Sequence, residues 1–151
     1  MGDFMSRTVQ ADVLISGNAK GPVLVLEEPL SFWGGFDPEC GKIIDTHHSQ
    51  YGETVRGRVL FIPASRGSAG TPGGIAETLR NGSGPCAFVL GKRDVNISIG
   101  VLVANRLYDM QVPVIEIPLQ DFELFSSDDE VHIRLDGRLI LINGSKNNEA
   151  N

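Results

Sequence analysis

The chain has 151 residues, of which 41% are hydrophobic and 21% charged, and its formal net charge is -6. This length and composition predict one folded domain with its own core and exclude a disordered chain. Because 13 basic residues face 19 acidic ones without a basic stripe, nucleic acids and anionic membranes are not expected as partners.

The chain ends and the apolar runs give further expectations. No stretch approaches the roughly 20 apolar residues of a membrane span, and the first residues lack the apolar run of a signal peptide. We therefore expect a soluble, cytoplasmic chain whose residues 1–151 form a single domain. The polar ends, 1–7 and 144–151, are expected to be mobile tails.

The first predicted elements are strands. Thr8–Ser16 mixes alternation with a short apolar run, which is typical of a half-buried strand, and Val23–Leu26 is apolar throughout. Glu27–Gly41 follows as a long loop with the only tryptophan, two phenylalanines and a glycine pair. Two interpretations of these aromatic residues stay open. They fill the edge of the core, or they form an exposed surface that meets a partner or covers a ligand.

Lys42–Thr46 is predicted to be a short strand, and His47 and His48 follow it. A histidine pair can bind a metal or transfer protons. No supporting Cys/His spacing accompanies it, so we interpret the pair as polar residues at a strand end. A metalloenzyme that uses both histidines is kept as a further hypothesis. Cys40 and Cys86 alone cannot build a metal site in this chain.

The centre of the chain is predicted to be a strand, Val55–Ile62, a loop of small residues, Ala64–Gly74, and a helix, Ile75–Arg80. A helix N-terminus offers unpaired N–H groups and a partial positive charge, so such a loop can hold an anion. A serine hydroxyl becomes reactive only beside a base or among donors that stabilise its alkoxide. Ser68, near the guanidinium of Arg66, is the candidate reactive group. The plain alternative is a turn of small residues that caps a helix.

The remaining elements alternate. Cys86–Leu90 and Val114–Ile117 are predicted strands around a helix at Ile99–Met110, and two more strands flank the turn Asp136-Gly137. A central β-α-β-α-β order predicts a parallel sheet. The expected fold class is therefore α/β, with a central parallel or mixed sheet and a flanking β layer.

Three stretches together resemble the small subunit, or swivel domain, of the aconitase X family. They are Pro29–Pro38 with Gly41–Asp45 and His47-His48, Gly57–Leu60 leading into Arg66-Gly67-Ser68, and Ile99-Gly100 through to Val112-Pro113-Val114. The resemblance covers about Ala11 to Ile142. Its most specific motif is the Ser-Phe-Trp-Gly-Gly run that begins at Ser31.

The resemblance implies a swivelling β/β/α domain that serves as the small subunit of a hydro-lyase (a dehydratase). A large subunit would hold an iron–sulfur cluster, and this chain alone would bind none. Ser68 matches the family's serine and, as an alkoxide, would remove a proton beside a carboxylate while the cluster acts on the departing hydroxyl. The implied substrate-binding residues are Arg66, Gly67, Ala69, Gly70 and Thr71. The implied partner or site loop is Ser31, Phe32, Trp33, Gly34, Gly35, His47 and His48. Within it, the segment Phe32–Phe36 is expected to be exposed and to contact the large subunit.

Relatives act on cis-3-hydroxy-L-proline or on mevalonate 5-phosphate. We favour hydroxyproline, with 1-pyrroline-2-carboxylate as product, because the composition lacks the Lys and Glu enrichment of a thermophile. Ser65 stands where the family often has glycine, and residues 69–72 replace a run of serines. The alternatives are a phosphomevalonate dehydratase small subunit and a non-catalytic domain that binds a small carboxylate or a partner.

Overall fold

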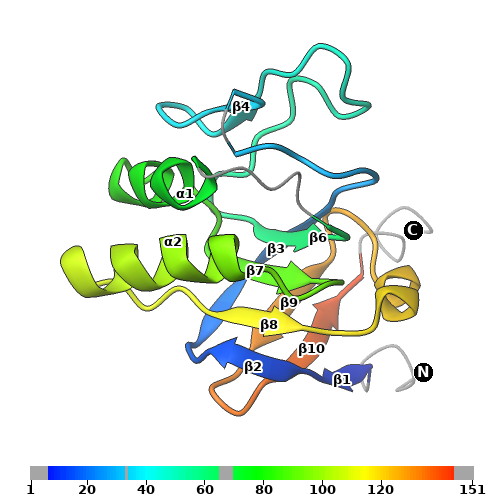
Figure 1. Ribbon diagram of the computed structural model, residues 1–151. Helices are drawn as coiled ribbons and strands as arrows, with labels where there is room; N and C mark the ends of the chain where they lie inside the picture. Colours follow the sequence, from blue (N-terminus) through cyan, green and yellow to red (C-terminus); the bar gives the residue numbers. More distant parts are fainter. Residues whose placement is uncertain (1–6, 33, 65–69, 145–151) are drawn as a thin grey trace.

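The computed structural model describes residues 7–32, 34–64 and 70–144 (Figure 1). Within these residues the chain forms an eight-stranded mixed sheet, a two-stranded sheet and two α-helices. The elements in chain order are β1 (Thr8–Gln10), β2 (Asp12–Ile15), β3 (Ala19–Val25), β4 (Phe36–Asp37), β5 (Lys42–Ile43), β6 (Val59–Ile62), α1 (Thr71–Arg80), β7 (Ala87–Leu90), α2 (Val95–Leu107), β8 (Val114–Glu116), the 3-10 helix η2 (Leu119–Leu124), β9 (Glu130–Ile133) and β10 (Arg138–Asn143).

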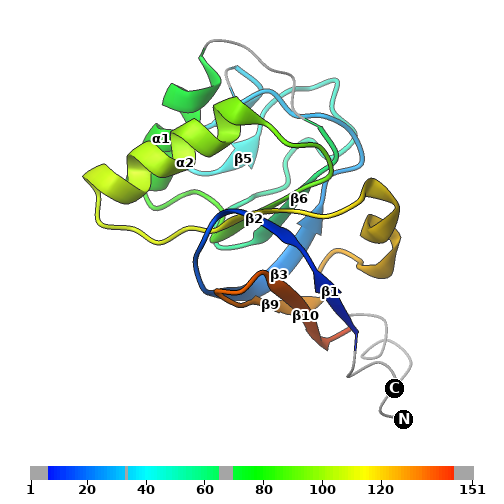
Figure 2. The same ribbon diagram turned by 60° about the horizontal axis from the view of Figure 1, so that its bottom comes forward.

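The large sheet curves until its two ends meet. Its strand order is β1-β10-β9-β3-β6-β7-β8-β2, so β1 and β2 lie at opposite ends of that order. In the chain, however, only Ala11 separates them, and Figure 2 shows them as one bent ribbon. The N–H of Ala11 donates to the carbonyl of Gly137 at 3.0 Å, which fixes the bend. The strand predicted over Thr8–Ser16 is therefore divided into two, because the chain bends at Ala11 to close the sheet.

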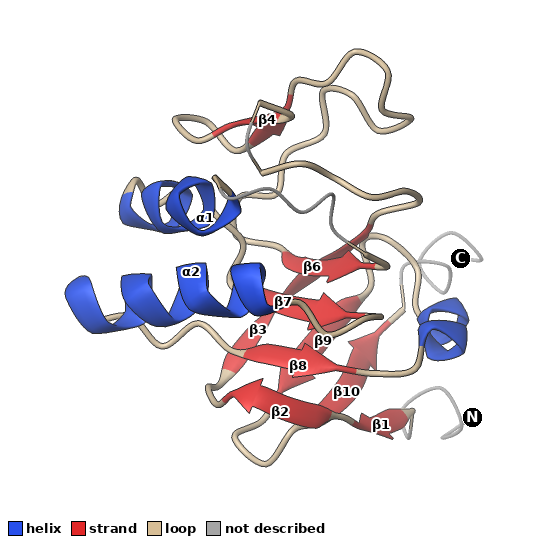
Figure 3. Ribbon diagram, in the orientation of Figure 1, coloured by secondary structure: helices blue, strands red, loops and turns tan. Residues whose placement is uncertain are grey.

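The central strands β3, β6, β7 and β8 run parallel, and α1 and α2 lie side by side on one face of them (Figure 3). All four residues of β6 are buried because alternate side chains enter two different cores. Leu60 and Ile62 pack toward the helices, whereas Val59 and Phe61 point into the curved sheet. There the Phe61 ring lies 5.3 Å from the ring of Phe122 and 5.2 Å from that of Phe125. The predicted α/β class with a mixed sheet and a second β layer is confirmed.

The structure corrects the predicted end of one strand and the predicted start of the second helix. The strand expected over Lys42–Thr46 ends at Ile43. The second helix begins at Val95 instead of Ile99 because Asp94 caps it, accepting the Ile97 N–H at 2.9 Å.

Burial raises the pKa of the Cys86 thiol to about 11. This value exceeds the ordinary value of 9.0, so the buried neutral thiol contributes to the stability of the fold. That contribution is complete below pH 9 and is lost as the pH rises toward 11. The thiolate is the nucleophile, so we expect a disulfide reagent at pH 8 to label Cys86 at least about tenfold more slowly than the exposed Cys40. In denaturant both should react alike. Equal rates in the folded chain, compared through Cys40→Ser and Cys86→Ser variants, would contradict this.

Candidate functional site

The candidate site lies at the edge where the parallel strands end. β6 ends at Ile62 and the N-termini of both α-helices lie at this edge (Figure 1). Backbone hydrogen bonds continue one residue past the ends of β3 and β7. The Leu26 N–H donates to the Phe61 carbonyl and the Gly91 N–H to the Ile62 carbonyl, both at 2.9 Å. Ligands of open α/β sheets bind at this carboxyl edge. Residues 63–70, which we name the serine segment, connect it to α1.

Part of the predicted site lies outside the described residues. This applies to Ser68, Arg66, Gly67 and Ala69 in the serine segment and to Trp33. What the structure gives is the frame around them, which consists of Pro63 and Ala64 after β6 and of Gly70 and Thr71 at the start of α1.

Among the described residues, no side chain caps the N-terminus of α1. The N-cap residue is Gly70, which has no side chain, and the first turn contains no acidic residue. Pro72 follows in the first turn, where its fixed φ favours the helix. The N-terminus of α2 differs, because the Asp94 carboxylate caps it. Of the two helix N-termini at this edge, only that of α2 is capped by a described side chain, and the partial positive charge of a helix N-terminus attracts anions.

Two glycines fix the position of this first turn. A methyl group at Gly74 would overlap the carbonyl oxygen of Phe32. A methyl group at Gly100, on α2, would lie 2.8 Å from the Pro72 carbonyl oxygen and 2.9 Å from Cβ of Ile75. The start of α1 is thus held between the segment after β3 and α2, at distances that only glycine allows.

Alanine substitutions at adjacent positions test this close approach. Gly74→Ala should lower the free energy of unfolding by about 2 kcal/mol, because α1 or the Phe32 backbone must shift. Gly73→Ala is the matched control, since nothing lies within 4 Å of its added methyl group. It should raise the stability by about 0.5 kcal/mol through helix propensity. Urea unfolding measures both, and equal stabilities of the two variants would refute the proposed contact.

The prediction that Phe32–Phe36 is exposed is wrong for both phenylalanines. Phe32 is 3% exposed, and its ring lies 5.4 Å from that of Phe36 and 6.4 Å from that of Phe88 in edge-on contacts. Their burial favours the other interpretation, in which the aromatic residues fill the core beside α1. Gly34 is exposed, with a φ of 90°, and Ser31 is partly buried.

The histidine pair is divided between surface and interior. His47 is exposed, whereas the side chain of His48 is fully buried. The Nδ1 atom of His48 accepts the Gln50 N–H at 3.0 Å, and its Nε2 lies 3.3 Å from the Glu28 carbonyl oxygen. In this arrangement Nδ1 accepts a hydrogen bond, and Nε2 can donate one to the carbonyl. His48 therefore fastens the loop after β5 to the end of β3, and the two rings do not share one open site.

Gln50 is a connecting residue that the sequence did not reveal. Its side-chain amide donates to the Val25 carbonyl at 2.8 Å and accepts the Glu27 N–H at 2.9 Å. The side chain thus completes hydrogen bonds that the end of β3 would otherwise lack. A single glutamine in a loop carries no pattern from which this could be predicted.

Among the described residues, no group of three His, Cys, Asp or Glu side chains could hold a metal ion. No described helix has the length and apolar character needed to cross a bilayer.

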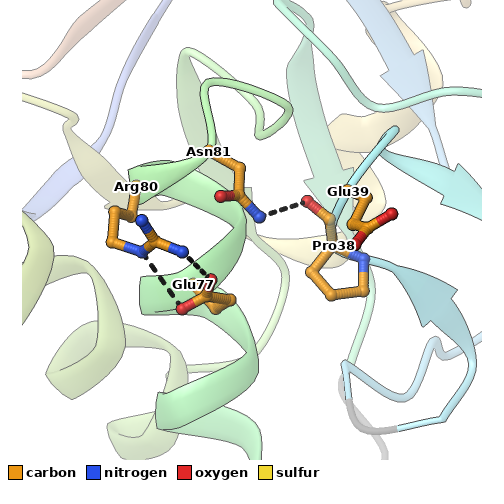
Figure 4. A pocket seen from close by; sticks show the side chains of 5 residues that line it. All are labelled: Pro38, Glu39, Glu77, Arg80 and Asn81. Carbon is orange, nitrogen blue, oxygen red and sulfur yellow. Dashed lines mark hydrogen bonds and ion pairs between the residues drawn. The ribbon is translucent and has the colours of Figure 1, made fainter.

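A polar groove of about 450 Å³ lies at the other end of α1 (Figure 4). Its lining residues are Pro38, Glu39, Glu77, Arg80 and Asn81. The hydrogen bond from Arg80 lowers the pKa of the Glu77 carboxyl, and the Asn81 amide donates to the Pro38 carbonyl at 3.1 Å. The ten residues of α1 span about 15 Å, which separates this groove from the serine segment.

A curved mixed sheet with two helices on one face defines a domain of the mixed α/β class. The family model described as the aconitase X swivel domain matches residues 8–142. The chain belongs to the aconitase X swivel-domain family, which confirms the resemblance. The holo-form of Thermococcus kodakaraensis aconitase X has the same fold, with a TM-score of 0.80 and 24% identity over 91% of this chain and 99% of that one. A UPF0107 protein solved by solution NMR gives a TM-score of 0.79 at 29% identity, over 91% of this chain and 100% of the other.

Curated relatives fall into two groups. This chain is 38% identical, over 72% of its length, to a cis-3-hydroxy-L-proline dehydratase of Hypocrea jecorina, but it spans only 18% of that protein. The Pseudomonas aeruginosa protein of the same name is 37% identical over 67% of this chain, which spans 17% of that protein. A phosphomevalonate dehydratase small subunit of Methanothermobacter thermautotrophicus is 34% identical, over 85% of this chain and 92% of its own length.

Proposed function

We propose that this chain is the small subunit of an aconitase X-type dehydratase and that it supplies Ser68 as the base. The observation that carries the proposal is the start of α1, which follows β6 at the carboxyl edge and has no side-chain cap from any residue that the structure describes. In the family's sequence pattern the serine comes just before such a helix, three residues ahead of Thr71 here. The N–H groups of this turn stabilise an oxyanion.

The chemistry is the loss of water from a β-hydroxy carboxylate. The Ser68 oxygen, as an alkoxide, accepts the proton from the carbon next to the carboxylate. The electrons of that C–H bond form a C=C double bond, and the hydroxyl on the neighbouring carbon leaves and takes up the proton that Ser68 accepted, which gives water and restores the alkoxide. With cis-3-hydroxy-L-proline the enamine formed in this way tautomerises to 1-pyrroline-2-carboxylate, as a proton moves from the ring nitrogen to the carbon that lost the hydroxyl. Arg66 and the N–H groups at residues 67–70 hold the negative charge that builds on the substrate carboxylate.

The iron–sulfur cluster that the family membership suggests does not fit the described part of this chain, which offers no group of three possible ligands. We therefore assign the cluster to the large subunit. A bound cluster supplies Lewis acidity toward the leaving hydroxyl.

For the substrate we favour cis-3-hydroxy-L-proline. The identity to the hydroxyproline dehydratases, 38% and 37%, exceeds the 34% to the phosphomevalonate protein. Glu27 and Glu28 follow β3 at the same edge as the serine segment. Carboxylates there favour a substrate with an ammonium group over one with a phosphate. Mevalonate 5-phosphate is the second candidate, because this chain matches almost the full length of a phosphomevalonate dehydratase small subunit.

The test is an assay of both substrates with the two-chain complex, made by co-expression with the large chain encoded in the same genome. We expect water loss from cis-3-hydroxy-L-proline with a kcat/KM at least about 100-fold above that for mevalonate 5-phosphate, a discrimination that one charged contact can supply. The opposite ratio would assign the chain to the phosphomevalonate enzymes. Turnover of neither compound, with tight calorimetric binding of a small acid to the isolated chain, would favour a binding domain.

A further inference from the structure

His48 is a polar side chain in the interior of the molecule. Its ring is completely buried, and a buried polar group is costly unless protein partners replace the hydrogen bonds of water. Here both ring nitrogens have such partners, which are the Gln50 N–H at Nδ1 and the Glu28 carbonyl at Nε2. The Glu28 carboxylate also lies 3.8 Å from Nδ1 and accepts the Ser49 N–H at 3.1 Å. A buried ring with two fixed partners holds the segments that carry them at a set distance.

The loop that carries His48 holds the start of a neighbouring segment. We name residues 44–50 the clamp loop and residues 26–35, which follow β3, the post-β3 segment. Beside the bond from the histidine ring, the Gln50 side chain donates to the Val25 carbonyl at 2.8 Å and accepts the Glu27 N–H at 2.9 Å. Three side-chain hydrogen bonds from two clamp-loop residues therefore fix the place where the post-β3 segment leaves the sheet.

The same loop holds the other end of the post-β3 segment. The N–H groups of Ile44 and Asp45 both donate to the Gly35 carbonyl, at 3.0 and 3.2 Å. Between its two held ends the segment runs to the start of α1 (Figure 1). There the Phe32 carbonyl oxygen lies so close to Gly74 that an added methyl group would overlap it. A shift of the post-β3 segment therefore presses on the first turn of α1.

We propose that His48 is a positioning residue, which fixes the first turn of α1 through the post-β3 segment. The inference rests on the proposed function, in which the substrate carboxylate lies against the N–H groups at this turn. The ring of His48 is buried, so it acts on the turn through the backbone of Glu28 and not through the substrate. Misplacement of a group by about 1 Å can lower the rate about 100-fold, because the charge of the transition state is then held less well.

Two substitutions separate the two hydrogen bonds of the ring. The side-chain oxygen of asparagine lies near the place of Nδ1, so His48→Asn keeps the acceptor for Gln50 and loses the donor to Glu28. The side-chain nitrogen of glutamine reaches the place of Nε2, so His48→Gln keeps the donor to Glu28. We expect His48→Asn to lower kcat of the two-chain complex about tenfold or more and to change KM less than about threefold. His48→Gln should keep kcat within about threefold of the wild-type value.

His132→Asn is the matched control for these variants. The ring of His132 also makes a hydrogen bond, with its Nε2 3.0 Å from the Asn18 side-chain oxygen. It lies on β9 opposite Lys20, near the start of β3 and away from the carboxyl edge. The variant should change kcat and KM less than about twofold.

The isolated chain gives a second measurement that does not depend on catalysis. The Gly74 N–H donates to the Gly70 carbonyl at 3.0 Å, so its hydrogen exchange reports how firmly the first turn of α1 is held. We expect this exchange to be about fivefold faster or more in His48→Asn and near the wild-type rate in His48→Gln. The amides of β9 and β10 should exchange at the wild-type rate in both. Gln50→Ala, which cuts the other side-chain bonds to the post-β3 segment, should also speed the exchange of Gly74.

Unchanged Gly74 exchange and kcat in a folded His48→Asn variant would overturn the inference. Where His48→Asn does not fold, unchanged Gly74 exchange in Gln50→Ala would overturn it in the same way. Equal losses in the Asn and Gln variants, or equally faster exchange in β9 and β10, would show that His48 supports the fold as a whole. If Gly74 exchanges faster in His48→Asn but the wild-type complex dehydrates neither substrate, the positioning of the turn stands and the proposed function fails.

Discussion

Ser68→Ala should lower kcat of the two-chain complex about 1,000-fold or more and leave its assembly and KM nearly unchanged. Removal of a positioned proton acceptor costs this much because the methyl group of alanine cannot take the proton. In the proposed function the substrate is bound by Arg66 and the backbone N–H groups, which the variant keeps. Single-turnover kinetics with cis-3-hydroxy-L-proline, together with the elution volume of the complex, measure both effects.

Ser65→Ala is the matched control for this prediction. It removes an equivalent hydroxyl from the same serine segment, at a position where the family often has glycine, and should change kcat less than about fivefold. If Ser68→Ala keeps turnover near the wild-type value, Ser68 is not the base. If both serine variants lose activity equally, the effect comes from the segment as a whole.

Phe32→Ala should lower the free energy of unfolding of the isolated chain by about 3–5 kcal/mol. The ring is almost completely buried and contacts Phe36 and Phe88, so its removal leaves a cavity beside α1. This is a large part of the 5–15 kcal/mol that stabilises a typical domain. Urea unfolding followed by circular dichroism gives the value.

Tyr51→Ala serves as the control, because Tyr51 is an aromatic residue that is 58% exposed. It should change the stability by less than about 0.5 kcal/mol. An interface role for Phe32 makes the opposite prediction, namely normal stability of the isolated chain and weaker binding of the large chain. That result would contradict the core position that the structure gives to this ring.

Most element types could be predicted from the sequence because their patterns are local. The apolar runs at Val23–Leu26, Val55–Ile62 and Cys86–Leu90 predicted parallel strands, although β6 begins only at Val59, and the Asp136-Gly137 turn predicted the final hairpin. The pairings that close the sheet are not local. The bend at Ala11 and the contact of β1 with β10 join residues more than 120 positions apart, and no short pattern specifies them.

The start of α1 shows a different limit. Gly70, Pro72, Gly73 and Gly74 indicated a loop up to Ile75, whereas the helix begins at Thr71. Proline is favourable in a first turn, and Gly74 is required there by the Phe32 carbonyl rather than by a turn. A glycine that forms a turn and a glycine that makes room for a neighbour look the same in the sequence. Here the neighbour, Phe32, lies 42 positions before Gly74.

The candidate site was predicted from a family motif more than from physical pattern. The choice of Ser68 stays a prediction because it lies outside the described residues, whereas the burial of Phe32 and the connecting role of Gln50 were not predicted. An aromatic residue in a long loop carries the same sequence signal whether it faces the core or a partner.

The most direct test of the central claim is a crystal structure of the two-chain complex with bound substrate. Our account predicts the Ser68 oxygen about 3 Å from the carbon that loses its proton, with the substrate carboxylate against the N-terminus of α1. A substrate bound elsewhere, with Ser68 more than about 8 Å from that carbon and another base beside it, would contradict the account.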